Sequence, residues 1–260
     1  MPRDLHRPAP LTPVLIASSL LLTLCTVAHP ATAAPWAGDP DIPAQARSPG
    51  GGPSVLRHDI HRLVSSATLR FWVAGAALAF AAHRDENPDR AEASLGTGAI
   101  DVPADLGNLY GSGITLGAGS LLLYAAGHVA GDANLRGSGS EMARSLAYTT
   151  VIVSALKIAV GRTRPDGGHY SFPSGHTAAA FAMAPTLSHR FGLRAAIPAY
   201  ALAVATGLGR MEDRKHYLSD VVMGAAIGLS IGRAVAGPNA NAAGPQLSLG
   251  PGGAEVTLHF

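Results

Sequence analysis

The chain carries six mostly apolar stretches, which polar, glycine-rich or proline-rich segments separate. No alternating apolar and polar pattern of the kind that strands show occurs before Gly237, so we predict that these stretches are helices. Ser174 is a natural N-cap, and Pro165 prevents the helix before it from continuing. The predicted helices cover residues 55–82, 114–131, 141–160, 174–192, 193–208 and 217–236. The fold class is therefore all-α, with one helical domain over residues 55–236.

The segment between the first two predicted helices, residues 83–113, is polar and then glycine-rich, and we expect a long connection there. It overlaps a stretch without charge, residues 106–131, which is the one stretch after the N-terminal leader that is long enough to span a bilayer outright. The charge-free stretches 145–156 and 221–232 suit buried helices of a soluble bundle as well as short spans. The sequence leaves membrane insertion open.

The tail, residues 237–260, has a different pattern. Apolar and polar residues alternate on both sides of the turn residues 250–253. The apolar positions are Leu247, Leu249, Val256, Leu258 and Phe260. This pattern predicts one β-hairpin, and because a lone hairpin is marginally stable in water, we expect it to pack on the helices or to be disordered.

The N-terminus has the order of a secretory signal peptide. A basic start precedes an apolar stretch, residues 14–28, and a small-x-small cleavage site that ends at Ala33. The apolar stretch is short for an uncleaved anchor helix. We expect residues 1–33 to be a cleaved signal peptide and residues 34–54 a flexible linker. The protein is then exported, and it is periplasmic or membrane-associated with its active site on the extracytoplasmic side.

Composition narrows the class of protein further. Only 14% of the residues are charged, against about 25% in an ordinary soluble domain, which favours a tightly packed or membrane-associated helical protein. The formal net charge of +2 provides no extended basic surface, so no nucleic-acid partner is expected. Cys25 is the only cysteine, which excludes an intramolecular disulfide and a cysteine-built metal site, and Leu24 before it does not fit a lipoprotein signal.

Three short stretches carry the candidate chemistry. In the first, Lys157 lies in an apolar helix, where an ammonium is costly without a partner, and Arg164 follows the helix end. In the second, Ser174 caps a helix, Gly175 lets an anion approach the backbone closely, and His176 lies in the first turn beside the free amides. Each feature alone also fits ordinary structure: a lysine reaching an interface, or a capped helix start with an incidental histidine.

The third stretch reads Arg210-x5-His216-x3-Asp220. If it is helical from His216 onward, His216 and Asp220 share one face, and the carboxylate can hold one imidazole nitrogen while the other attacks. Together the three stretches provide positive charges, directed donors and two imidazoles, which phosphoryl transfer requires. Glu212 and Asp213 are expected to form surface pairs and not a metal site. Four further residues are expected in loops or at the rim: Arg162, His169, Arg214 and Lys215.

The order Lys-x6-Arg-Pro, Pro-Ser-Gly-His and Arg-x5-His-x3-Asp resembles the motifs of the type 2 phosphatidic acid phosphatase/vanadium haloperoxidase superfamily, which includes bacterial class A acid phosphatases. The motifs span residues 157–220. One departure is Gly209, where the family usually has a serine before the arginine, and the change removes a possible hydroxyl contact.

The resemblance implies a six-helix bundle that hydrolyses phosphate esters without a metal or other cofactor. It makes His216 the nucleophile that forms a phosphohistidine, with Asp220 orienting it, and His176 the acid that protonates the leaving group. The phosphate-binding residues that it implies are Lys157, Arg164, Ser174, Gly175 and Arg210.

The substrate on this reading is a phosphorylated lipid such as phosphatidate, or a small periplasmic phosphomonoester. The apolar helices favour the lipid, and the signal peptide permits either. Two other functions are a vanadate-dependent haloperoxidase, which needs an oxidant site and usually a larger chain, and a non-catalytic phospholipid-binding protein. Binding alone does not require His176 and His216 together, which argues against the last.

Overall fold

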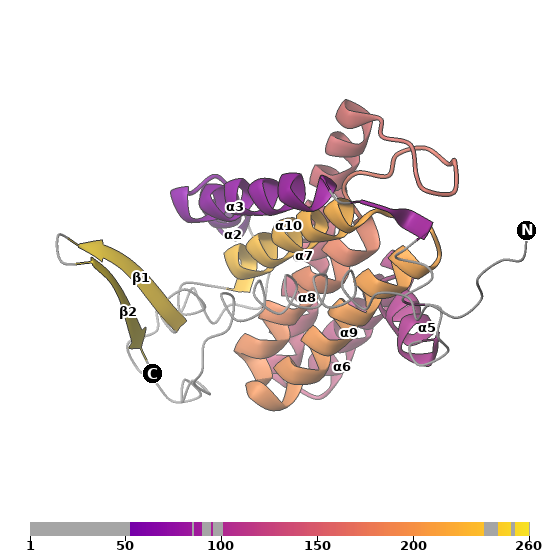
Figure 1. Cartoon of the computed structure of the whole chain (residues 1–260). Helices are drawn as coiled ribbons and strands as arrows, with labels where there is room; N and C mark the ends of the chain where they lie inside the picture. Colours follow the sequence, from indigo (N-terminus) through magenta and orange to yellow (C-terminus); the bar gives the residue numbers. More distant parts are fainter. Residues whose placement is uncertain are drawn as a thin grey trace, which may run out of the picture.

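A computed structural model of the chain describes residues 53–84, 86–89, 95, 101–236, 244–250 and 253–259. The predicted signal peptide and nearly all of the predicted linker lie outside the described residues. Within the described part, eight helices and two strands follow one another (Figure 1). They are α2 (Pro53–Leu63), α3 (Ser66–His83), α5 (Asp101–Tyr110), α6 (Gly113–Val129), α7 (Ala133–Val160), α8 (Gly175–Phe191), α9 (Leu193–Glu212), α10 (Leu218–Ala236), β1 (Gly244–Gly250) and β2 (Gly253–His259).

The domain is built of helices as predicted, but the number of helices differs from six. The predicted helix 55–82 consists of α2 and α3, which are bent by 47°. The cause is Ser65, whose backbone is extended and whose hydroxyl accepts the N–H of Thr68 at 3.4 Å, so that it caps a new helix. The predicted connection 83–113 contains α5.

The charge-free stretch 106–131 is also not one straight helix. It is divided between α5 and α6, which are bent by 61°. Ser112 lies at the break and accepts the N–H of Thr115 at 3.0 Å, which starts α6 anew. A hydropathy pattern shows how long an apolar stretch is, but not where a helix breaks within it. Because the helix breaks at Ser112, the predicted continuous span is divided between two helices.

Helix α7 begins eight residues before the predicted start at 141. Asp132 caps it by accepting the N–H groups of Asn134 and Leu135 at 2.7 and 3.1 Å. Gly139, which precedes the predicted helix 141–160, lies inside α7 at a close contact with α6. A Cβ there would lie 2.4 Å from the backbone nitrogen of Tyr124, so α6 and α7 can pack this closely only because glycine has no side chain.

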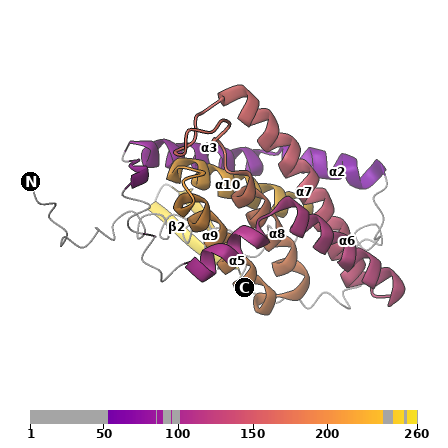
Figure 2. The same ribbon diagram turned by 90° about the vertical axis from the view of Figure 1, so that its right-hand side faces the viewer.

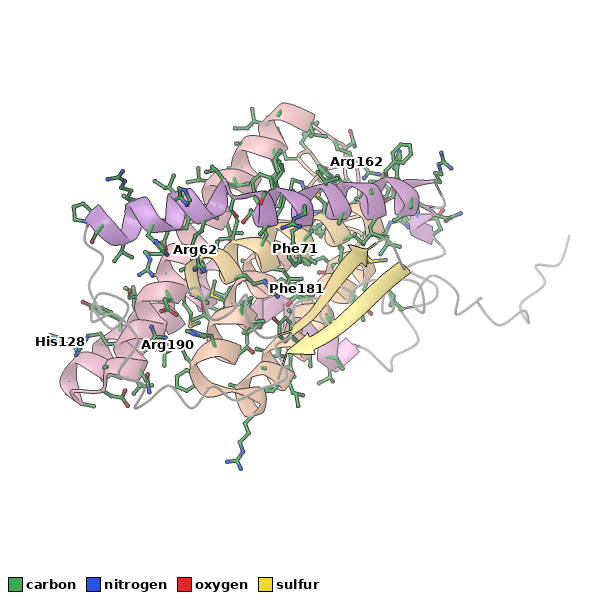
Figure 3. All side chains as sticks on the ribbon, turned by 90° about the vertical axis from the view of Figure 1, so that its left-hand side faces the viewer. Arg62, Phe71, His128, Arg162, Phe181 and Arg190 are labelled. Atoms are coloured by element: carbon green, nitrogen blue, oxygen red, sulfur yellow. The ribbon has the colours of Figure 1, made fainter. Side chains whose placement is uncertain are left out.

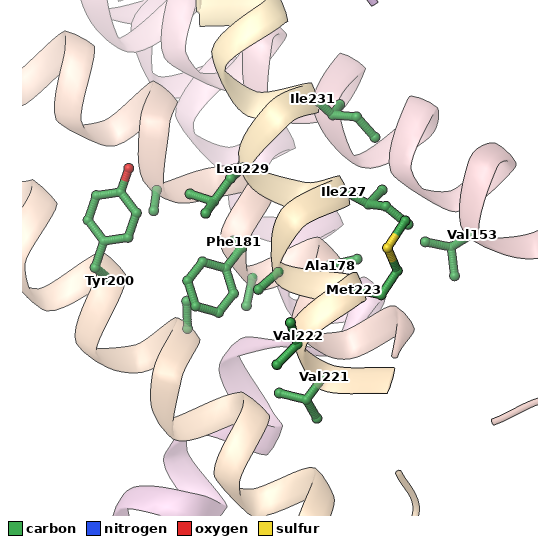
Figure 4. Close-up of a cluster of buried hydrophobic side chains, with 14 of the residues drawn as sticks. Val153, Ala178, Phe181, Tyr200, Val221, Val222, Met223, Ile227, Leu229 and Ile231 are labelled. Atoms are coloured by element: carbon green, nitrogen blue, oxygen red, sulfur yellow. The ribbon is translucent and has the colours of Figure 1, made fainter. Parts of the chain in front are cut away.

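The core forms around α10, which contacts α2, α3, α7, α8 and α9 (Figures 1 and 2). Nearly all of its residues are buried, so its sequence is apolar on every side. Figure 4 shows Phe181 of α8 and Leu229 of α10 pointing into the same cluster, with Tyr200 of α9 beside them and Val153 of α7 on the other side of α10. This central helix carries Asp220 in its first turn, so the core fixes the position of that carboxylate.

Helices α8 and α10 approach each other through glycines spaced four residues apart. A Cβ on Gly224, Gly228 or Gly232 would lie 2.6, 2.2 or 2.4 Å from the carbonyl oxygens of Ser174, Ala178 and Ala182, respectively. Residues four apart lie on one helix face, so a glycine ridge on α10 packs against the backbone of α8. This contact holds the start of α8 against the start of α10.

We expect Gly228→Ala to destabilise the protein by about 1–3 kcal/mol, since the added methyl has no room and the helices must separate. Gly119→Ala in α6 is the matched control, because nothing lies within 4 Å of a Cβ there. The control should be neutral or stabilising, since alanine favours helix over glycine. Thermal unfolding in detergent measures both changes, and equal midpoints for the two variants would contradict the tight α8–α10 contact.

Strands β1 and β2 pair antiparallel, with Leu247 opposite Val256 and Gly250 opposite Gly253. They are drawn in yellow in Figure 1. Their side chains lie outside what the structure describes, so the expectation that this hairpin packs on the helices stays a prediction.

Two described helices, α7 and α10, are long and apolar enough to cross a membrane. The number rises to four if the bent pairs α2–α3 and α5–α6 each count as one span. Large apolar side chains are also exposed along several helices, a pattern that marks a lipid or partner contact. Examples are Val73, Phe80, Leu121, Leu122, Val151 and Ile158.

Candidate active site

The three motifs meet where α7, α8, α9 and α10 begin or end. Helix α7 stops because Gly161 adopts a left-handed conformation (φ 62°), and its N–H bonds to the carbonyl of Lys157 at 2.9 Å. The following segment, residues 161–174, returns to α10, where the N–H of Ser174 donates to the carbonyl of Asp220 at 2.9 Å. These contacts bring residues far apart in sequence into one site.

Lys157 is held by the backbone of this segment. Its Nζ donates to the carbonyl oxygens of Tyr170 at 2.6 Å and Ser171 at 3.4 Å. Tyr170 has a positive φ of 60°, an uncommon conformation for a non-glycine residue. The lysine on its apolar helix thus has the partners that its burial requires.

Arg164 and Arg210 both present buried donors to the site. The Nε atom of each is buried and has no hydrogen-bond partner among the described residues. Arg210 also donates through Nη1 to Asp213 at 2.9 Å and to Asn108 at 3.4 Å, which fixes its guanidinium. A buried donor without a partner is costly, and an anion between these two groups would satisfy both.

Ser174 occupies the N-cap position of α8, as the sequence predicts, but its hydroxyl makes no capping bond. Its Oγ lies 2.9 Å from Oγ1 of Thr177 instead. A Cβ on Gly175 would lie 3.8 Å from Cε of Lys157, so the glycine faces the lysine. The first amides of α8 therefore lie beside a cation, in an arrangement suited to an anion.

Burial lowers the pKa of both histidines, which favours their neutral forms. The pKa of His176 is lowered to about 4, first by burial and then by the neighbouring basic groups Arg210, His216, Lys157 and Arg164. The pKa of His216 is also lowered, chiefly because burial disfavours the charged imidazole, although Asp220 acts in the opposite direction. The charges that act on His176 show that the members of the three motifs share one electrostatic site.

His216 lies just before α10, not inside it, because the helix begins at Leu218. Its Nδ1 lies 3.6 Å from Oδ2 of Asp220, slightly longer than a normal hydrogen bond. Catalytic hydrogen bonds are often long in ligand-free structures and tighten in the complex. The Nδ1 atom faces the carboxylate, and Nε2 is on the opposite side of the ring.

Asp220 has more partners than the sequence indicates. Its Oδ2 accepts from the hydroxyl of Ser171 at 2.5 Å and from the N–H of Tyr217 at 2.9 Å. Its Oδ1 accepts from Nη1 of Arg162 at 2.8 Å. Ser171 and Arg162 were missed by the sequence analysis, which placed Arg162 in a loop or at the rim.

The other residues that we excluded lie at the rim as ion pairs or ring contacts. Lys215 pairs with Asp166, Arg214 with Asp89, and His169 packs against Tyr170. Asp213 pairs with Arg210, so it acts on the site indirectly. Within the described residues, no three His, Asp or Glu side chains are grouped as a metal site.

Fold and site together define a helical domain in which cations and imidazoles from the three motifs lie together at the ends of four helices. Residues 140–237, which contain all three motifs, match the family model described as the PAP2 superfamily. The match covers less than half of the chain, and it confirms the resemblance seen in the motifs.

Three relatives have similar sequences. A lipid A 1-phosphatase of Porphyromonas gingivalis is 42% identical over 85 residues, which cover 31% of this chain and 19% of the relative. A lipid A 4'-phosphatase of Helicobacter pylori is 31% identical over 104 residues, covering 35% and 52%. Lipid phosphate phosphatase 2 of Arabidopsis thaliana is 31% identical over 131 residues, covering 34% and 45%. The chain therefore spans about half or less of the length of these relatives.

A solved structure is also similar. It is a transmembrane PAP2-type phosphatidylglycerolphosphate phosphatase from Bacillus subtilis, with a TM-score of 0.42 and 21% identity. The match covers 70% of this chain and 92% of the other.

Proposed function

We propose that this protein is a phosphatase that hydrolyses phosphate monoesters of lipids through a phosphohistidine, without a metal. The observation that carries the proposal is the pair of buried Nε atoms of Arg164 and Arg210, which have no hydrogen-bond partner among the described residues, beside two histidines whose pKa values are lowered. With Lys157 and the start of α8, these donors would surround the oxygens of a phosphoryl group and stabilise their charge in the transition state.

The first step follows from the geometry of His216. Its Nε2 attacks phosphorus, the phosphorus–oxygen bond of the ester breaks, and His176 gives a proton to the departing oxygen. Asp220 faces Nδ1–H and stabilises the positive charge that develops on His216. In the second step water attacks the phosphohistidine, His176 accepts its proton, and inorganic phosphate leaves.

The role of His176 as an acid depends on the substrate itself. In the free enzyme its pKa of about 4 leaves the imidazole neutral at neutral pH, because the ring is partly buried and basic groups surround it. A bound phosphate dianion would neutralise those cations and favour the protonated form. Substrate binding would therefore load His176 with the proton that the leaving group needs.

A lipid substrate fits the position of the site at the end of α7. This helix has 28 residues, or about 42 Å, which exceeds the roughly 30 Å of a bilayer core. It ends at Val160, and the site residues 161–176 follow directly. We propose that the protein associates with a membrane through its exposed apolar helices, with the site at the extracytoplasmic surface, where it would meet a lipid phosphate headgroup.

The test is release of phosphate from phosphatidate and from a soluble phosphomonoester by the detergent-purified protein. Activity should survive EDTA, because the site consists of cations and imidazoles, and vanadate should inhibit it, because five-coordinate vanadate mimics the transition state. Sulfate at the same concentration is the control for simple anion binding, and we expect it to inhibit more weakly. Complete loss of activity in EDTA that magnesium restores would exclude the proposed mechanism.

A further inference from the structure

A chain of ionic contacts connects Asp220 to the segment after α3. Arg162 donates through Nη1 to Oδ1 of Asp220 at 2.8 Å and through Nη2 to Oε2 of Glu86 at 2.5 Å. The other oxygen of Glu86, Oε1, accepts the N–H of Ser219 at 2.9 Å. His83 lies at the solvent end, with Nδ1 2.7 Å from Glu86. One guanidinium thus bridges two carboxylates.

These groups are shielded from water. The side chains of Asp220, Glu86 and Arg162 are 0%, 6% and 20% exposed. Arg162 also lies over the ring of Tyr217, with its Cζ 4.0 Å from the ring centre. A buried carboxylate is costly unless it is paired and hydrogen-bonded, and the flat fork of an arginine can serve two carboxylates at once. One arginine therefore supplies charge-assisted hydrogen bonds to both Asp220 and Glu86.

We propose that Arg162 and Glu86 are positioning residues, which fix the orientation of the Asp220 carboxylate toward His216. The inference rests on the proposed function, because it assigns a role within that reaction. Arg162 fixes Oδ1 of Asp220, and this turns Oδ2 toward Nδ1 of His216 at 3.6 Å. Glu86 fixes Arg162 and, through Ser219, the first turn of the helix that carries Asp220.

Glu86 lies outside residues 140–237, the segment that matches the family model. It belongs to the short described segment 86–89 after α3. Figure 3 shows Arg162 near one end of α3, whereas Arg62 and Arg190 lie elsewhere on the molecule. The N-terminal helix α3 therefore contributes to the site by delivering Glu86 to Arg162.

The variants are Arg162→Gln, Arg162→Lys and Glu86→Gln, with kcat and KM measured per folded molecule. We expect kcat to fall by about 10- to 100-fold in Arg162→Gln, the range for outer partners that orient active-site groups, with KM nearly unchanged. Arg162→Lys should recover part of the loss, because lysine can contact one carboxylate but not both. Glu86→Gln keeps an acceptor for Ser219 and tests the charge alone, should Arg162→Gln fail to fold.

A double-mutant cycle separates positioning from a general structural role. If Arg162 acts through Asp220, Arg162→Gln should change kcat by less than about 2-fold when Asp220→Asn is already present. Independent, multiplied losses would overturn the proposal, and so would wild-type kcat in folded Arg162→Gln or Glu86→Gln.

Arg144→Gln is the matched control. Arg144 also joins two helices through a buried carboxylate, Asp59, at 2.8 Å, but it lies 13 residues before Lys157 on α7, about 20 Å from the site. We expect lower stability with unchanged kcat per folded molecule. An equal loss of kcat in this control would show that any broken buried pair has the same effect, and would overturn the proposal. Wild-type protein without phosphatase activity would refute the proposed function, whereas active wild type with unaffected Arg162 and Glu86 variants would refute this inference alone.

Discussion

His216→Ala is expected to abolish turnover and to remove the covalent phosphoenzyme. His216 is buried and lies beside the carboxylate of Asp220, as a neutral imidazole nucleophile requires, whereas the charged groups that act on His176 are basic. Rapid quench with labelled substrate, followed by gel separation under alkaline conditions that preserve phosphohistidine, measures the intermediate directly.

His176→Ala is the matched variant for this experiment. With nitrophenyl phosphate, whose leaving group needs little protonation, the phosphoenzyme should still form in this variant. With phosphatidate, the same variant should form it far more slowly. If His216→Ala accumulates phosphoenzyme and His176→Ala does not, the roles of the two histidines are reversed.

Asp220→Asn is expected to lower kcat by about 10⁴-fold, the loss seen when the carboxylate of a comparable triad becomes an amide. An amide cannot replace both oxygens here, because Oδ1 faces Arg162 and Oδ2 faces Ser171 and Tyr217, all of which are donors. One of these donors would then face an NH2 group, and Nδ1 of His216 would lose its acceptor. We therefore expect a wrong tautomer of His216 and a lower unfolding temperature.

Asp89→Asn is the control for this substitution. Asp89 is a carboxylate whose side chain is 79% exposed and whose partner, Arg214, lies at the rim of the site. Such exposed pairs contribute little, so kcat and stability should stay close to wild type. Phosphate release by both variants measures the contrast, and an active Asp220→Asn enzyme would remove Asp220 from the mechanism.

Several helix boundaries depend on contacts that a linear pattern does not contain. Ser65 caps a helix inside the predicted single helix 55–82, and Ser112 caps a helix inside the predicted connection 83–113. A serine caps a helix only where the backbone leaves the helical conformation. Gly139 precedes the predicted helix 141–160, yet it lies within α7, where α6 packs against its bare backbone. Spacing and composition alone could not decide these three positions.

The sequence analysis did not predict the roles of Arg162, which lies close to a motif in the sequence, and of Glu86, which lies far from all three motifs. Arg162 stands two residues before Arg164, and nothing local tells which of the two faces the phosphate and which faces Asp220. Glu86 precedes Asp220 by more than a hundred residues, so no spacing rule connects them. The signal for Arg162 was its place inside the first motif; for Glu86 the sequence contained none.

The sequence by itself determined the helical class of the domain, and it indicated where a candidate site lies and the types of its chemical groups. Helical periodicity, capping residues and the three short motifs each involve residues that are close together in the sequence. They can therefore be recognised without knowledge of the fold. Only the tertiary structure decided which groups meet Asp220, because that depends on α10 lying at the centre of the fold with the segments before Arg164 and after α3 packed around its first turn. Burial then lowered the pKa of His176 and His216, and burial is a property of the folded chain.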